Sequence, residues 1–127
     1  MNKARTALAS ARILLEAGDT DGATNRAYYA MFDAAIAALA WADPDIGHDP
    51  PRTHGGLIAR FGRRLVQTGV LSAAYGRAFN RVQELRLTAD YLAAPVTSEK
   101  AAWAIGEAEN FVAAIALAQS GPSPPTG

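Results

Sequence analysis

The segment from Ala27 to Ala42 constrains the fold more than any other part of the chain, because Asp33 is its single charged residue. Asp43-Pro44 ends it, since proline disfavours helical geometry in the preceding residue. A helix that is apolar nearly all round must be surrounded by other helices, or by a partner chain as well. We therefore expect a central helix that a second chain also covers. The alternative is an alanine-rich helix that leaves one weakly hydrophobic side in water.

The composition makes an all-α fold the prediction for the whole chain. Its 127 residues include 29 alanines but only 5 valines and 6 isoleucines. Alanine has the highest helix propensity, whereas β-branched residues favour strands. No stretch alternates steadily between apolar and polar residues, and no Asn-Gly or Asp-Gly hairpin signal occurs.

Glycines, prolines and capping residues divide the chain into predicted helices joined by short connections. Short connections make neighbouring helices antiparallel, so we expect an up-down bundle of four to five helices. We expect one domain over residues 1–119, followed by a disordered Pro/Ser/Gly tail at 120–127 that has nothing to bury. The predicted helices span about 2–17, 20–42, 53–67, 72–92 and 97–119, with Asp19 or Thr20, Thr53, Ser72, and Thr97 or Ser98 as the expected N-caps.

Several classes of protein are excluded. The 12 basic residues balance 12 acidic ones, so no broad basic surface exists to bind nucleic acid by charge alone. Cysteine is absent, His48 and His54 lack a third ligand, and no phosphate-binding loop occurs, so we expect neither metal nor cofactor. Charged residues recur throughout and no signal peptide is evident, so we expect a cytoplasmic protein without a membrane span. Arg60, Arg63 and Arg64 are expected to form a solvated basic face.

Arg86 is the most unusual charged residue of the fourth predicted helix. It lies one turn after Val82, beside the apolar stripe, so its side chain must reach outward or find a partner. Asp90 follows one turn later and can hold the guanidinium group, whereas Tyr91 lies about 140° round the helix from Arg86. The alternative is an ordinary surface salt bridge, worth roughly 0.2–0.5 kcal/mol.

Two further groups could contribute to a site. Arg26 and Tyr29 share a helix face and could present a cation and a hydroxyl group beside a cleft, whereas Tyr28 and Phe32 are expected to pack in the core. The segment Arg52-Thr53-His54-Gly55-Gly56 places His54 at a helix N-terminus, where backbone amides attract anions. The alternative there is a capping turn with an incidental histidine.

These pieces, in this order, resemble a small stand-alone HEPN domain over about residues 3–118. The resemblance rests on Asn25-Arg26-Ala27-Tyr28-Tyr29-Ala30-Met31-Phe32, on Thr53-His54-Gly55-Gly56-Leu57-Ile58 with Phe61, and on Arg86-Leu87-Thr88-Ala89-Asp90-Tyr91. It implies a helical bundle that commonly dimerises. Many family members are RNA-cleaving toxins encoded beside a minimal nucleotidyltransferase antitoxin, and their chemistry is metal-independent attack of a ribose 2′-hydroxyl on its own phosphate.

The resemblance also implies an arginine followed after four to six residues by a histidine, with the motifs of two protomers meeting in a cleft. Arg86 matches the arginine, but the positions open to histidine hold Tyr91, Leu92 and Ala93. The Arg-x-x-Ala-Asp-Tyr form resembles a separate HEPN subfamily. Tyrosine, with an ordinary pKa near 10, is a poor general base at neutral pH. His54 could supply the missing imidazole if its helix approaches Arg86.

Three functions remain open at this point. The first is a module that binds a nucleotidyltransferase partner and RNA or a nucleotide. The second is a metal-independent endoribonuclease with a site at a dimer interface, and the third is a structural scaffold. The candidate catalytic residues are Arg86, Asp90, Tyr91 and His54, and the candidate binding residues are Arg26, Tyr29 and Arg52.

Overall fold

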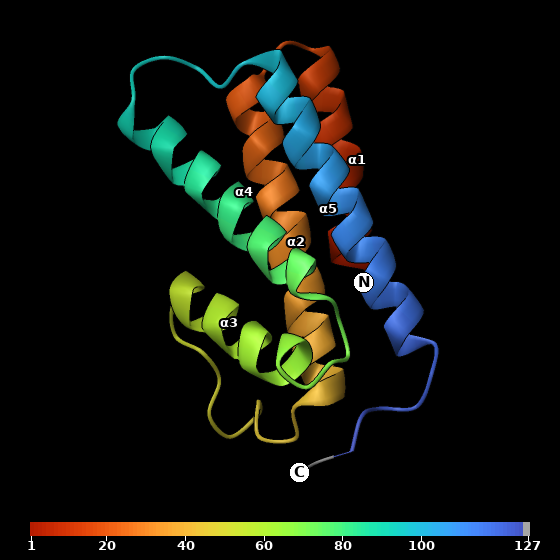
Figure 1. Cartoon of the computed structure of the whole chain (residues 1–127). Helices are drawn as coiled ribbons and strands as arrows, with labels where there is room; N and C mark the ends of the chain where they lie inside the picture. The colour runs from red at the N-terminus through yellow and green to blue at the C-terminus, as the bar shows by residue number, and fades with distance from the viewer. Residues whose placement is uncertain (126–127) are drawn as a thin grey trace.

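The computed structural model describes residues 1–125, which form a helical bundle without strands (Figure 1). The all-α prediction is confirmed. α1, α2 and α5 pack together, α4 crosses beside α2, and α3 lies against the C-terminal part of α2. The elements are α1 (Asn2–Glu16), α2 (Thr20–Ala42), α3 (His54–Phe61), a π-helical turn η1 (Gly62–Val66), α4 (Ala73–Tyr91) and α5 (Ser98–Gln119).

The helix ends lie close to where the capping residues predict them. A side-chain oxygen at the N-cap accepts a hydrogen bond from a backbone N–H of the first turn, which has no partner within the helix. The N-caps that do so are Asp19, Thr53, Ser72 and Thr97. Gly18 follows α1 with a φ of +87°, and Gly69 follows η1 with a φ of +81°. Other residues rarely adopt this left-handed conformation, so glycine suits both reversals.

α2 is the central helix, as its apolar composition predicts. It contacts α1, α3, α4 and α5, and Tyr28 and Met31 on it are fully buried. Its outward side is not entirely covered, because Ile36 remains 46% exposed. The neighbouring helices therefore account for most of the burial that the sequence demands of this segment.

An aromatic cluster joins the helices that pack on α2. The rings of Phe61, Phe79 and Phe111 come from α3, α4 and α5, and their centroids lie 5.1–5.8 Å apart. Such tilted and edge-on contacts are favourable geometries for aromatic side chains. The end of α3 is thereby fixed against α4 and α5, and Phe79 also contacts Tyr28 on α2, with ring centroids 5.9 Å apart.

The length and hydropathy of α5 contradict the prediction that no segment of the chain resembles a membrane span. Within the described residues, it alone has the length and hydropathy to cross a membrane, because its alanine-rich part carries just Glu107 and Glu109 as charges. However, one face of α5 packs on α1, α2 and α4, and its buried residues include Ile105, Phe111 and Ile115. This is the environment of a core helix in a bundle.

The segment after α5 carries no helix or strand from Ser120 to Pro125. The predicted disordered tail extends to residue 127, and its last two residues lie outside the described part. The boundary at residue 119 and the disorder of the tail stay predictions.

Candidate active site

Tyr28 on α2 is the centre of the candidate site. The residue is fully buried, and its hydroxyl oxygen lies 2.7 Å from Nδ1 of His54, the first residue of α3. The two rings are stacked, with centroids 5.6 Å apart and an angle of 22° between their planes. A buried tyrosine hydroxyl needs a hydrogen-bond partner, and His54 provides it. The histidine at this capping turn is therefore part of a packed cluster.

Arg86 reaches the same tyrosine from α4. Its guanidinium carbon lies 4.6 Å from the ring centroid of Tyr28 and 5.7 Å from that of Tyr29. These are cation–π distances, at which the electron-rich ring faces attract the positive charge. Arg86 Nε donates a hydrogen bond of 3.0 Å to Oε1 of Gln83, one turn earlier. Arg86 and His54 therefore both contact the side chain of Tyr28, although their helices are far apart in the sequence.

The predicted contact between Arg86 and Asp90 is wrong. The ion pairs of the described residues do not include it, and Asp90 is exposed. The reason is the direction of the arginine side chain, which turns inward to the tyrosine rings. On that inner side the acceptor within reach of Nε is Gln83.

Tyr91 also lies apart from this cluster. α4 remains helical through Tyr91, so the side chain diverges from Arg86 as the helical geometry predicts. Tyr91 is 92% exposed, and its neighbours Leu87 and Leu92 are also exposed, by 44% and 60%. Within a single chain Tyr91 therefore lies away from Tyr28 and His54, and it forms an exposed apolar surface with Leu87 and Leu92.

The predicted pairing of Arg26 with Tyr29 is present. The guanidinium carbon of Arg26 lies 5.6 Å from the ring centroid of Tyr29, and Tyr29 makes an edge-on contact with His54 at 5.9 Å. We use "Tyr28 cluster" for Tyr28, Tyr29, His54 and Arg86. Arg26 contacts the cluster through Tyr29 from the solvent side, because its own side chain is exposed.

The environment of Tyr28 keeps its hydroxyl group protonated. Burial raises the pKa of Tyr28 to about 12, which the positive charge of Arg86 partly opposes and the neighbouring Tyr29 reinforces. At neutral pH the hydroxyl is thus a hydrogen-bonding group and not a base. In the neutral tautomer of His54 whose Nδ1–H donates to the hydroxyl oxygen of Tyr28, Nε2 carries no proton and can accept one from a ligand.

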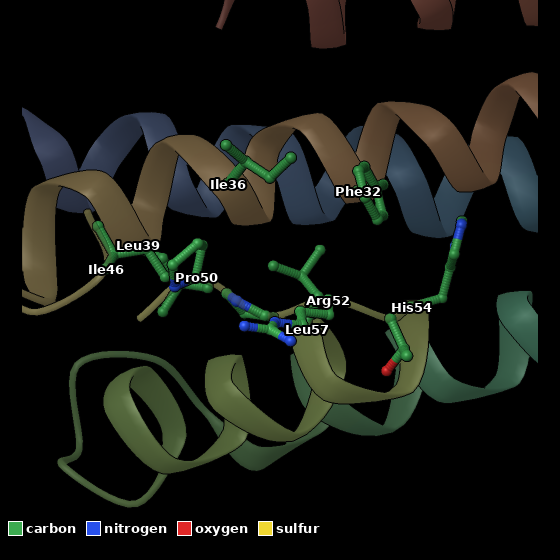
Figure 2. Close-up of a pocket in the computed structure, with 10 residues that line it drawn as sticks. Phe32, Ile36, Leu39, Ile46, Pro50, Arg52, His54 and Leu57 are labelled. Atoms are coloured by element: carbon green, nitrogen blue, oxygen red, sulfur yellow. The ribbon is translucent and has the colours of Figure 1, made fainter. Parts of the chain in front are cut away.

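A pocket of about 290 Å³ adjoins the cluster between α2 and the segment that leads into α3. Figure 2 shows Phe32 and Ile36 on α2 facing Arg52, His54 and Leu57 across it. Its walls are mostly apolar, and the polar lining residues are Arg52, Thr53 and His54. The structure therefore places Arg52 at this pocket and not in the Tyr28 cluster, and His54 belongs to both.

A buried ion pair holds the loop that forms one wall of the pocket. Arg60 Nε donates a hydrogen bond of 2.6 Å to Oδ2 of Asp43, and Arg60 Nη1 donates one of 2.8 Å to the carbonyl oxygen of Asp49. Burial alone raises the pKa of Asp43, but the hydrogen bonds from Arg60 and from the Asp45 N–H, with the charges of Arg60 and Arg64, leave it below its ordinary value.

The predicted solvated basic face is therefore wrong for Arg60. The loop after α2 folds back over α3 and buries Arg60 against Asp43, while Arg63 and Arg64 remain exposed. Asp43, the acidic residue before Pro44, was the feature of the sequence that could have indicated the ion pair with Arg60. The sequence pattern marked it only as the end of a helix.

Tyr28 itself was missed as a candidate site residue. The sequence pattern assigned it to core packing, and it does pack in the core, but a tyrosine at such a position brings a hydroxyl group that phenylalanine would not. That difference was the available signal. Within residues 1–125, no three His, Cys, Asp or Glu side chains gather in a way that could hold a metal ion.

The structure is a small all-α domain in which an arginine of α4 and a histidine of α3 meet at a tyrosine of α2. The chain belongs to the HEPN family, because the family model for the HEPN domain matches residues 1–118. This confirms the resemblance that the sequence motifs indicated. No solved structure gives a significant match.

Among its relatives, a Methanocaldococcus jannaschii protein named "Putative toxin MJ0605" is 38% identical over 105 residues, which are 83% of this chain and 75% of that protein. A UPF0332 protein of Thermotoga maritima is 35% identical over 70% of this chain and 64% of its own length. A third, from Gloeobacter violaceus, is 33% identical over 72% of this chain and 68% of the relative. The matched region thus spans about two-thirds to three-quarters of these relatives.

Proposed function

We propose that this chain is the toxin of a two-protein toxin–antitoxin system and that it cleaves RNA. The observation that carries the proposal is the convergence of His54 and Arg86 on Tyr28, which brings a proton-transfer group and a phosphate-binding group to one place. The similarity to a relative whose name describes a toxin supports the class of function.

The proposed reaction needs no metal ion. His54 accepts the proton of a ribose 2′-hydroxyl through Nε2 while the 2′-oxygen attacks the adjacent phosphorus atom. The bond from phosphorus to the 5′-oxygen breaks, and that oxygen takes up a proton from solvent water as it leaves, so the products are a 2′,3′-cyclic phosphate and a 5′-hydroxyl. His54 then returns the proton it accepted to solvent. Within the described residues, the terminal nitrogens of Arg86 donate no hydrogen bond to the protein, which leaves them for the phosphate oxygens.

Cleavage of total RNA and of tRNA by the purified protein tests this function. In buffer with a metal chelator, we expect fragments that end in 2′,3′-cyclic phosphates and begin with 5′-hydroxyl groups, detected by end-specific labelling. Fragments with 3′-hydroxyl ends would indicate a different chemistry. Intact RNA at micromolar protein concentrations would overturn the nuclease assignment and favour a module that only binds.

We further propose that a minimal nucleotidyltransferase acts as the antitoxin and that the chain forms a homodimer in the cytoplasm. An exposed apolar surface supports an interface, since Leu87, Tyr91 and Leu92 lie uncovered at the end of α4. Leu87 follows Arg86 directly in the sequence, so a second chain bound there would contact the part of α4 that carries Arg86.

Co-expression with a neighbouring nucleotidyltransferase gene is expected to yield a complex that survives gel filtration. Leu87→Asp should dissociate the complex or the dimer, because it places a charge in the proposed interface. The matched control is Leu117→Asp on α5, a residue that is 76% exposed. Equal effects of the two substitutions would contradict this placement of the interface.

A further inference from the structure

The pocket beside the Tyr28 cluster has the features of a site for one flat ring system. Its volume of about 290 Å³ lies at the lower limit of small-molecule sites, which suits one heterocycle better than an extended ligand. Its walls include Phe32 and Ile36 of α2 and Leu57 of α3. Burial of an uncharged ring face against these apolar side chains is favourable, and these side chains offer few hydrogen-bonding groups.

The aromatic side chains lie at the end of the pocket that adjoins the cluster. The rings of Phe32 and His54 have centroids 4.9 Å apart and planes inclined by 38°. Phe32 and His54 are both partly exposed, so a ligand in the pocket can reach either ring. Nucleic-acid bases stack on such side chains in single-stranded binding sites, largely without regard to sequence.

The charges around the pocket favour a ligand whose ring system carries an anionic group. Arg52 lines the pocket and is exposed, and none of the lining residues is acidic. Among the nearby acidic groups, Asp43 is paired with Arg60, and the carboxylate of Asp49 lies 3.8 Å from Arg60 Nη1. A base carrying a phosphate thus matches the site in both shape and charge.

We infer that this pocket binds one base of the RNA, next to the phosphate held at the Tyr28 cluster. The inference rests on the proposed function, and His54 connects the two sites because it lines the pocket and also contacts Tyr28. A base between α2 and Arg52 positions its own ribose and phosphate beside His54. The pocket therefore fixes the position of the nucleotide whose phosphate is presented for cleavage.

Binding of 3′-nucleoside monophosphates to the whole protein tests this inference directly. Calorimetry with 3′-AMP, 3′-GMP, 3′-CMP and 3′-UMP is expected to show saturable binding by at least one of them. Inorganic phosphate at the same concentrations should bind at least tenfold more weakly, because it lacks the base. Equal affinity for phosphate, or no binding of any of the four nucleotides, would overturn the inference.

Ile36→Glu is the informative variant, since Ile36 lines the pocket but is 46% exposed and should tolerate a polar side chain. We expect its affinity for the bound nucleotide to fall at least tenfold. Ile13→Glu is the control, because Ile13 is 67% exposed on α1 and does not line the pocket. Unchanged nucleotide affinity in Ile36→Glu would overturn the assignment of the site.

The result separates the pocket from the nuclease. Nucleotide binding that Ile36→Glu abolishes, in a protein that leaves RNA intact, supports the pocket and contradicts the nuclease function. RNA cleavage with an unchanged KM in Ile36→Glu supports the nuclease and contradicts the pocket. If an apolar fluorescent dye binds in an Ile36-dependent manner while all four nucleotides fail to compete, the pocket accepts apolar groups of a protein partner, and the inference is wrong.

Discussion

Replacing Arg86 with alanine is expected to lower the rate of RNA cleavage at least a hundredfold. The guanidinium group lies over the ring of Tyr28, 4.6 Å from its centroid, where it can stabilise the charge that develops on the phosphate. Loss of one such donor typically costs about 10²–10³ in kcat. The measurement is the initial rate of cleavage of a labelled RNA, with the helical circular-dichroism signal recorded to confirm folding.

Arg81→Ala is the matched control, because Arg81 is an exposed arginine on the same helix. It should retain nearly the full rate. His54→Ala should reduce the rate to a similar extent as Arg86→Ala, since both groups act on the same phosphodiester. Full activity in Arg86→Ala would show that Arg86 takes no part in the mechanism. It would also contradict the assignment of the Tyr28 cluster as the active site.

Replacing Asp43 with alanine is expected to destabilise the bundle by about 3 kcal/mol, because it leaves the buried guanidinium of Arg60 without its carboxylate partner. Chemical denaturation at pH 7 measures the free energy of unfolding. The control is Asp45→Ala, whose exposed carboxylate lies 3.9 Å from Arg64 and should contribute less than about 1 kcal/mol. Similar losses in the two variants would contradict a special role for Asp43.

The effect of Asp43 should also depend on pH. The pKa of Asp43 is lowered in the folded protein, so the stabilisation is fully present above the unfolded-state pKa, about 3.9, and is lost as the pH falls below it. The difference in unfolding free energy between wild type and Asp43→Ala should therefore be largest above about pH 5 and shrink in acid. A difference that does not change with pH would show that Asp43 acts through packing alone.

The sequence predicted the fold well because the relevant signals are local. The N-cap side chains, the left-handed glycine at position 18 and the apolar spacing each act within one or two turns of helix, so a single chain shows them. The central position of α2 was also predictable, because a segment with Asp33 as its single charge has no polar face to present to water.

The candidate site was only partly predictable, because its contacts join helices that are far apart in the sequence. The Tyr28–His54 hydrogen bond spans 26 positions, and no periodicity encodes which buried tyrosine a histidine will face. Arg86 was identified as an arginine in need of a partner, but the partner expected was Asp90 on its own helix. The inward alternative, two tyrosine rings on α2, depends on how α4 crosses α2. The pairing of Asp43 with Arg60 depends similarly on how the intervening loop folds back.

The Asp43–Arg60 pair has a consequence for how proteins of this shape can diversify. It fastens the loop at its start, and Arg60 also binds the backbone carbonyl of Asp49, so that contact does not depend on the identity of the side chain at position 49. Between these two anchor points, Ile46 is the one residue that lines the pocket. Changes in this short span can reshape the wall of the pocket while the helices keep their packing, so ligand preference and architecture can evolve as separable traits.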